Sequence, residues 1–315
     1  MSLCSRMKRK LKRGILGGLG VLAASLVGLV GYSSMAWGRT VDAPYPQIRA
    51  DVSPEGVTRG SAIFHAVCAS CHVPADGDRA KGARLTEAPE FLGQLYSANL
   101  TSHPTAGVGA RSDEEIARVI RFGVDHRGKH TPMPSFSMSD ADIAAIIGFM
   151  RSDDPLFRPD PTMQPRSELS MAGKTIIVLS GAAKTPDLPA RGVTAPKKEA
   201  SAEYGNYLTH SVYGCADCHT PGFAADKTTG PDAFTGGAEL RTPKGEPIYS
   251  PNLTPDETGI ARYDRATFRG AVRDGLRPDG SALSPPMPRF QGVDDTEIEA
   301  IYMYLQTLPK RRSAR

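Results

Sequence analysis

The pattern of apolar and polar residues predicts one long uncharged helix near the N terminus. Residues 14–32 carry no charged side chain. As a helix rising about 1.5 Å per residue, this run spans about 28 Å, close to the hydrocarbon thickness of a bilayer. Its strongly positive flank lies on the N-terminal side only, which predicts a cytoplasmic N terminus and export of the rest of the chain.

Residues 1–36 are therefore expected to be a membrane anchor or a signal segment. Tyr32 and Trp37 suit the interfacial belt of a retained anchor, which would leave the remaining chain in the periplasm on the inner membrane. Ser34-Met35-Ala36 places small residues where signal peptidase needs them, so cleavage after Ala36 is the alternative. Export is expected in both cases.

Two sets of short helices follow. Ser53 and Pro54 begin the first helix, and Ser201 begins its counterpart in the second set. A middle helix begins at Ser112, where Glu115 completes a capping box, and ends at Gly123. The last helix of each set has apolar residues at i, i+3, i+4 and i+7: Ile143, Ile146, Ile147 and Met150 in the first, and Ile298, Ile301, Tyr302 and Leu305 in the second. No segment alternates convincingly as a strand does, so the expected fold class is all-α.

Three motifs recur at shifts of 147, 153 and 154 residues: Cys68-Ala-Ser-Cys-His72 as Cys215-Ala-Asp-Cys-His219, Tyr96-Ser-Ala-Asn-Leu-Thr101 as Tyr249-Ser-Pro-Asn-Leu-Thr254, and Met133-Pro-Ser-Phe136 as Met287-Pro-Arg-Phe290. Two such copies indicate a duplicated small domain rather than a solenoid. The expected domains cover residues 37–152 and 204–315. The proline-rich segment 153–203 between them is expected to be a linker, with a short apolar element at Lys174–Leu179.

The formal charge of +4 comes from the two ends of the chain. Residues 37–309 carry 28 basic and 34 acidic side chains, so the body of the protein is acidic. This balance excludes a nucleic-acid binding protein.

Each Cys-x-x-Cys-His run has the spacing of a c-type haem attachment site. Two thiols one helical turn apart can add across the two vinyl groups of the porphyrin, and the adjacent histidine then lies under the iron. Cys68, Cys71 and His72 would hold one haem, and Cys215, Cys218 and His219 a second. Disulfides would leave the two histidines and the matched methionines unexplained. Zinc could bind two Cys-x-x-Cys pairs, but here 143 residues separate the pairs and each pair has its own histidine.

The ligand on the other side of each iron decides the function. Met133 and Met287 both precede a proline, in a loop just before the last helix of each copy. A methionine opposite histidine raises the haem potential and suits electron transfer. Met138 is a rival in the first copy, but the second copy has Gly292 at the equivalent place, so the repeat favours Met133.

The remaining histidines have no repeat partner in a ligand-like place. His65 and His210 lie three and five residues ahead of the first cysteine and so do not align. A second histidine ligand from His126 or His130 is the minority alternative.

These motifs resemble those of class I cytochromes c. More narrowly, the chain looks like the membrane-associated cytochrome c subunits of periplasmic alcohol and gluconate dehydrogenases, on the runs Cys215–Pro221, Gly236-Gly237 and Tyr249–Gly259 and on the Met-Pro pairs. The resemblance implies His/Met ligation at both irons and places Asn99 and Asn252 near the haem edges. Those subunits commonly carry three haems, whereas this sequence has two attachment motifs.

The leading functional hypothesis is a dihaem electron carrier without a catalytic residue, in a membrane-associated respiratory chain. Its expected partners are a dehydrogenase, and a soluble cytochrome or a terminal oxidase. The alternative is a dihaem enzyme resembling bacterial cytochrome c peroxidase or thiosulfate dehydrogenase. Such an enzyme needs one iron that is open, and two matched methionines argue against it.

Overall fold

The structure is a computed structural model that describes residues 3–75, 77–86, 88–181, 184–222, 226–242 and 244–313, with side chains from residue 15 onward. It consists mostly of helices. The α-helices are α1 (Leu3–Gly38), α2 (Pro54–Ile63), α3 (Ala69–His72), α4 (Asp113–Phe122), α5 (Asp140–Met150), α6 (Met171–Leu179), α7 (Ala202–Tyr207), α8 (Cys215–Cys218), α9 (Arg265–Arg273) and α10 (Asp295–Thr307).

Short turns of other helix types connect these elements. Two π-helices, η1 (Phe64–Cys68) and η4 (Leu208–Val212), continue α2 and α7. The 3₁₀ turns are η2 (Glu90–Leu92), η3 (Pro155–Phe157), η5 (Lys227–Thr229) and η6 (Ile260–Arg262).

Two antiparallel ribbons depart from the all-α expectation. They pair β1 (Gly93–Gln94) with β2 (Glu168–Leu169), and β3 (Glu239–Arg241) with β4 (Pro247–Tyr249). Strands of two or three residues are too short to show an alternating pattern, which is why the sequence gives no sign of them.

The predicted helix starts are confirmed in α2, α4 and α7. Ser53 and Ser201 accept a hydrogen bond from the backbone N–H three residues on. Ser112 and Glu115 form the reciprocal capping box, and Gly123 ends α4 with a φ of 63°, a left-handed conformation that glycine adopts easily.

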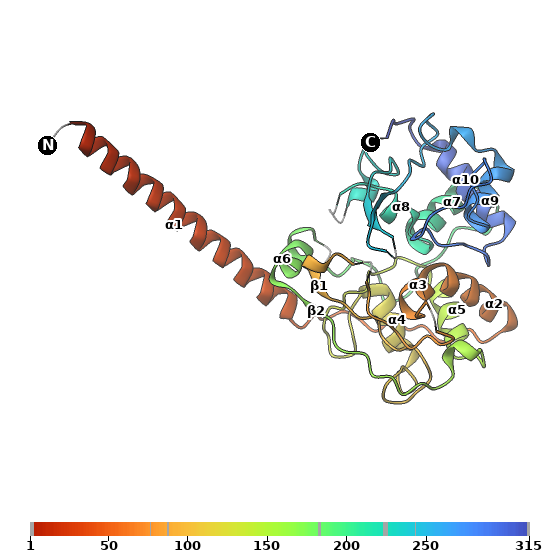
Figure 1. The fold of residues 1–315 in the computed structure, drawn as a ribbon. Helices are drawn as coiled ribbons and strands as arrows, with labels where there is room; N and C mark the ends of the chain where they lie inside the picture. The colour runs from red at the N-terminus through yellow and green to blue at the C-terminus, as the bar shows by residue number, and fades with distance from the viewer. Residues whose placement is uncertain are drawn as a thin grey trace.

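The helix packing has the same plan in both halves of the globular part. Figure 1 shows α2, α4 and α5 in one unit and α7, α9 and α10 in the other, with α1 extending away from the first unit. A Cβ added at Gly60 of α2 would lie 1.9 Å from the carbonyl oxygen of Ala145 in α5, and one added at Gly205 of α7 would lie 1.9 Å from that of Ala300 in α10. Both pairs of helices therefore cross at a glycine, where the backbones approach closely.

The two units share one hydrophobic core. A single cluster of buried side chains runs from Ile63, Phe64 and Ile146 in the first unit to Leu208 and Ile301 in the second. Because the two units bury this core together, they form one body and not two domains that move independently on a flexible linker.

The segment between the repeats, expected to be a linker, lies largely against the first unit. Gln164 donates hydrogen bonds to the carbonyls of Lys81 and Gly82, both at 2.9 Å, and β2 pairs with β1. The apolar stretch at Lys174–Leu179 is the C-terminal part of α6, which packs against α1 and η2.

Candidate haem sites

The two attachment motifs lie at equivalent points, each directly after the helix that carries the crossing glycine. Cys68 ends η1 and Cys71 and His72 lie in α3, whereas Cys215 and Cys218 bound α8 and His219 follows it. Helical backbone places residues i and i+3 on one face, so the two thiols of each pair can reach the same porphyrin edge. Burial, with a smaller effect from the paired cysteine, raises the pKa values of Cys68 and Cys215 to about 12.

Both histidines are buried and oriented by the same contact. Nδ1 of His72 is 2.8 Å from the carbonyl oxygen of Ala98, and Nδ1 of His219 is 2.8 Å from that of Pro251. Since a carbonyl only accepts, Nδ1 carries the proton and Nε2 keeps its lone pair. Burial lowers the pKa of both imidazoles, which favours the neutral form. A neutral imidazole with Nδ1–H bound to a carbonyl is the ligand arrangement found at metal centres.

Asn99 and Asn252 fix the loops that present these carbonyls. Oδ1 of Asn99 accepts from the backbone N–H of Thr101 at 2.9 Å, and Oδ1 of Asn252 accepts from that of Thr254 at 2.8 Å. Nδ2 of Asn252 also donates to the carbonyl of Arg311 at 2.7 Å. Each asparagine follows the residue that binds histidine, so its contacts hold that carbonyl in place. Their expected position near a haem edge stays a prediction.

The methionine loops are anchored in the same way in both units. The N–H of Thr131 donates to the carbonyl of Gly123 at 2.8 Å, and the N–H of Leu283 donates to that of Gly275 at 2.7 Å. Beyond each methionine, the N–H of Phe136 bonds to Ile120 and the N–H of Phe290 bonds to Val272, at 2.9 and 3.1 Å. Met133 and Met287 lie between these anchors and are both partly buried against the core.

Met138 has a different environment from Met133. It is fully buried, and its carbonyl accepts a hydrogen bond of 2.8 Å from Arg121. Its neighbour Ser139 caps α5 and donates its N–H to the hydroxyl of Tyr207 in the second unit at 2.8 Å. Met138 therefore packs in the core beside the contact between the units.

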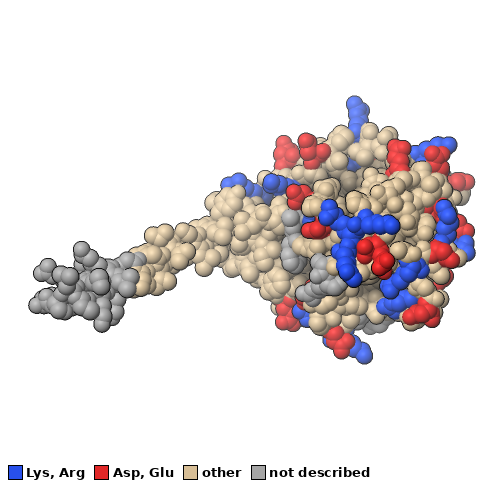
Figure 2. Space-filling model, turned by 90° about the horizontal axis from the view of Figure 1, so that it is seen from above, with Lys and Arg blue, Asp and Glu red and all other residues tan. Residues whose placement is uncertain are grey.

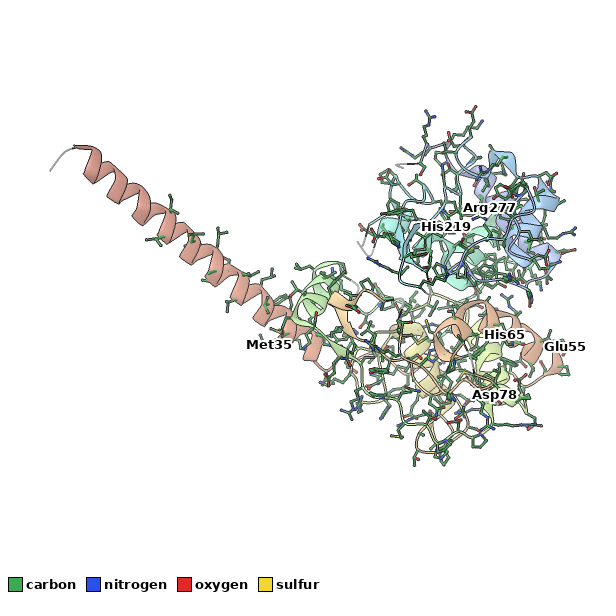
Figure 3. All side chains as sticks on the ribbon, in the orientation of Figure 1. Met35, Glu55, His65, Asp78, His219 and Arg277 are labelled. Carbon is green, nitrogen blue, oxygen red and sulfur yellow. The ribbon has the colours of Figure 1, made fainter. Side chains whose placement is uncertain are left out.

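The structure corrects the alignment of two histidines. His65 lies five residues after Gly60, and His210 lies five residues after Gly205. The ring centroid of His65 is 5.8 Å from that of Phe149 in α5, and that of His210 is 5.8 Å from that of Tyr304 in α10. They are thus equivalent, and two extra residues before the second motif hide this in a count from the cysteines. Figure 3 labels His65 in the first unit and His219, a proposed ligand, in the second.

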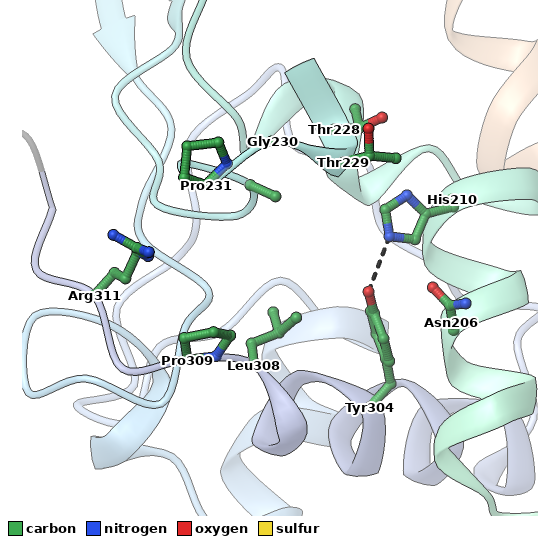
Figure 4. A pocket seen from close by; sticks show the side chains of 11 residues that line it. Asn206, His210, Thr228, Thr229, Gly230, Pro231, Tyr304, Leu308, Pro309 and Arg311 are labelled. Carbon is green, nitrogen blue, oxygen red and sulfur yellow. Dashed lines mark hydrogen bonds between the residues drawn. The ribbon is translucent and has the colours of Figure 1, made fainter. Parts of the chain in front are cut away.

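His210 also lines a pocket of the second unit (Figure 4). Its Nε2 lies 3.0 Å from the hydroxyl of Tyr304, and burial lowers the pKa of its imidazole. The residues expected to hold the second haem, Cys215, Cys218, His219 and Met287, do not line this pocket. The other histidines also have local contacts: the ring of His130 stacks on Trp37 at 6.0 Å, and Nδ1 of His103 accepts from the N–H of Ala106.

A cluster of charged side chains, which sequence analysis did not predict, lies between the two units. Nε of Arg59 on α2 is 2.7 Å from Asp142 on α5, and its Nη1 pairs with Glu297 on α10 of the other unit. The same Nη1 lies 3.2 Å from the hydroxyl of Tyr213. Burial opposes the guanidinium charge, but these acidic partners raise the pKa of Arg59 above its usual value.

Tyrosines of the second unit complete this cluster. Tyr207 donates to Asp142, and Tyr204 and Tyr213 donate to Glu297 at 3.0 and 3.1 Å. Asp142 and Glu297 occupy equivalent positions at the starts of α5 and α10, so one arginine serves both carboxylates. The paired residues of this cluster are 65 to 238 positions apart in the sequence, so no local pattern predicts it.

Comparison with known proteins identifies a domain family in the first unit. Residues 57–153 match the Cytochrome c family and form a cytochrome c domain. The first unit thus contains a cytochrome c domain, which implies covalently bound haem c.

Several relatives match most of this chain. It is 29% identical over 260 residues to the cytochrome c subunit of a quinone alcohol dehydrogenase from Gluconacetobacter polyoxogenes, which covers 77% of this chain and 53% of the relative. It is 26% identical over 284 residues to a diheme c-type cytochrome from Cereibacter sphaeroides, covering 84% of this chain and 89% of that protein.

A third relative covers a shorter stretch. The gluconate 2-dehydrogenase cytochrome c subunit of Pantoea cypripedii is 37% identical over 109 residues, or 34% of this chain and 23% of that subunit. The chain thus spans about half the length of the alcohol dehydrogenase subunits that it matches.

Proposed function

We propose that this chain is a dihaem c-type cytochrome that transfers electrons on the periplasmic side of a membrane. Residues 37–152 and 204–315 are two tandem cytochrome c domains. The observation that carries the proposal is the duplicated site: in both units a buried histidine donates Nδ1–H to a carbonyl at 2.8 Å and a methionine loop has the same backbone anchors.

The residues of each site have distinct roles. Cys68 and Cys71 would attach the first haem and Cys215 and Cys218 the second, by addition of their thiols to the vinyl groups. His72 and Met133 would hold the first iron, and His219 and Met287 the second. When bound, haem supplies a one-electron iron couple. The carbonyl of Ala98 or Pro251 holds each imidazole neutral and oriented, with Nε2 free to coordinate.

This set of ligands supports the role of an electron carrier over that of an enzyme. Neither unit is marked as the reactive one, because both present a methionine from the same anchored loop. An iron with histidine and methionine in place has no coordination position for a substrate. The cytochrome subunits of dehydrogenase complexes among the relatives support the same role.

The two sites are proposed to work as a fixed pair. The shared core and the Arg59 cluster hold the units together, so the distance between the two haems would be constant during turnover. Electrons would enter at one haem and leave at the other.

The location and partners of the protein follow from its N terminus and its relatives. Residues 15–38 of α1 form a helix long and apolar enough to cross a membrane, with a mean hydropathy of 2.0. The basic side chains ahead of it lie outside the residues whose side chains are described. We propose a retained inner-membrane anchor, a dehydrogenase as electron donor, and a soluble cytochrome or a terminal oxidase as acceptor.

Rapid mixing of the purified, fully reduced protein with a small soluble cytochrome c tests the carrier role. Both haems should oxidise quickly, and neither hydrogen peroxide nor thiosulfate should be turned over. Sustained peroxide turnover by the half-reduced protein, well above that of free haem, would reject the carrier in favour of a dihaem enzyme.

A further inference from the structure

Helix α6 lies against the anchor helix. In Figure 1 it is beside the C-terminal end of α1, on the side of the globular part that faces that helix. The Oγ hydroxyl of Ser34 on α1 donates a hydrogen bond to Sδ of Met171 on α6 at 3.7 Å. A shallow groove between the helices is lined by Met171 and by Leu26, Val27, Val30 and Gly31 of α1. The contact therefore runs from the middle third of the membrane-crossing segment into its last third.

Packing holds α6 at this place. A Cβ added at Gly173 would lie 2.4 Å from the carbonyl oxygen of Leu92, so α6 approaches η2 as closely as backbone allows. Ser170 caps the helix by accepting from the N–H of Gly173. Because η2 leads into β1, and β1 pairs with β2 just before α6, the helix is fixed to the first unit at both of these points.

The outward side of α6 is apolar. Met171 is 54% exposed and Leu179 60%, and Phe91 of η2 is 51% exposed. The helix has no acidic residue, and its one charged side chain, Lys174, is half-buried. A long amine of this kind can reach a headgroup layer while its stem stays in apolar surroundings. We call the exposed Phe91, Met171 and Leu179 the α6 patch.

The α6 patch continues the apolar surface of α1. Figure 2 shows charged side chains spread over the globular part and none on the described part of α1. At about 1.5 Å per residue, the 24-residue span Ile15–Gly38 is about 36 Å long, which exceeds the hydrocarbon thickness of about 30 Å. The excess of about 6 Å corresponds to about four residues, so the C-terminal end of α1 reaches the outer interface, and the groove residues 26–31 beside α6 lie just inside it.

The depth of this end of α1 is also fixed by the first unit. Trp37 stacks on the ring of His130, with centroids 6.0 Å apart, and Nζ of Lys129 donates to the carbonyl of Gly38 at 2.7 Å. The first unit cannot swing freely about the anchor while these contacts and the α1–α6 contact are made together.

We infer that the α6 patch is a second membrane contact, which inserts into the interfacial layer of the lipid bilayer beside α1. It holds the first cytochrome unit against the membrane surface, and the second unit is attached through the first. This inference rests on the membrane anchor of the proposed function. Lipid is the favoured occupant because the patch is continuous with the surface that the anchor presents to lipid, and because a partly apolar helix lying along the interface is a common membrane-binding element.

Spin labels in the intact, haem-loaded protein test the inference after reconstitution into lipid vesicles. Single cysteines replace Leu179 or Met171 in a Cys4→Ser background, and each nitroxide is probed with oxygen, which enters lipid, and with a polar nickel complex, which does not. Leu22→Cys on α1 is the reference for lipid. Val52→Cys is the matched control: it is an exposed apolar residue three positions before Glu55, which Figure 3 places at the end of the globular part away from α1.

The expected result is a ratio of oxygen to nickel collisions several-fold higher at Leu179 than at Val52, approaching that at Leu22. A lipid-like Leu22 with a Leu179 that matches Val52 would overturn the inference and leave the anchor intact. An aqueous Leu22 would reject the anchor and the inference together. Low collision rates with both reagents at Leu179 would mean contact with a second copy of the protein instead of lipid, and would also overturn it.

Discussion

Removal of Arg59 should destabilise the contact between the two units strongly. The arginine side chain is 19% exposed, and its partners Asp142 and Glu297 are 9% and 2% exposed. Arg59→Ala leaves both carboxylates without a cation in a site that water barely reaches. Breaking a buried ion pair from one side costs about 3–5 kcal/mol, because the remaining charge is uncompensated. With an unfolding entropy of about 2.1 cal/mol/K per residue over about 280 residues, that lowers Tm by roughly 5–9 °C.

Calorimetry of the purified protein measures this effect, with Arg265→Ala as the matched control. Arg265 pairs with Glu299 at 2.6 Å but is 70% exposed, so its loss should cost at most about 1 kcal/mol. Adding Glu297→Gln to Arg59→Ala should recover part of the loss, since one of the stranded charges is then neutral. If Arg59→Ala lowers Tm no more than Arg265→Ala does, the buried cluster does not hold the units together.

Three further predictions concern the ligands, the helix crossing and the tyrosines. Met133→Ala should keep both haems attached but lower the potential of the first haem and remove about half of the methionine-to-iron charge-transfer band, because the second haem keeps its own methionine. Met138→Ala should keep the full band and cost about 2–5 kcal/mol of stability, and loss of half of the band in that variant would contradict the assignment. Gly205→Ala should destabilise the second unit in denaturant titrations, because its Cβ would lie 1.9 Å from a carbonyl oxygen, while Gly270→Ala, with nothing within 4 Å, should be neutral or stabilising; equal effects would refute the close crossing. Burial and Asp142 raise the pKa of Tyr207, so stability is present below the unfolded pKa of about 10 and should fall by about 1.4 kcal/mol per pH unit above it; denaturant titrations from pH 9 upward should show this slope reduced in Tyr207→Phe, and an unchanged slope would exclude it.

The sequence predicts those parts of the protein that depend on local spacing. The Cys-x-x-Cys-His runs predict the proposed attachment sites because two thiols and a ligand must lie within one helical turn of each other. The capping box at Ser112 and Glu115 is equally local, and the structure confirms it. The apolar run near the N terminus predicts a long helix, which α1 forms.

Features that depend on long-range contacts could not be predicted in this way. Arg59 meets Glu297 only because two helix pairs pack on each other, and its neighbours in sequence give no sign of this. The equivalence of His65 and His210 is defined by where helices cross, and the two residues inserted before the second motif conceal it. The segment 153–203 was expected to be a linker because proline-rich composition reports the absence of regular structure, not the absence of contacts such as those of Gln164.

The central claim is that two haems are covalently bound, one to each Cys-x-x-Cys-His motif. Intact-mass spectrometry of the unfolded protein tests it most directly, with a Cys215→Ser, Cys218→Ser variant as comparison. The account predicts a mass increased by two haem groups for the unaltered protein and by one for the variant. A single haem on the unaltered protein, or loss of all haem on acid–acetone extraction, would contradict it.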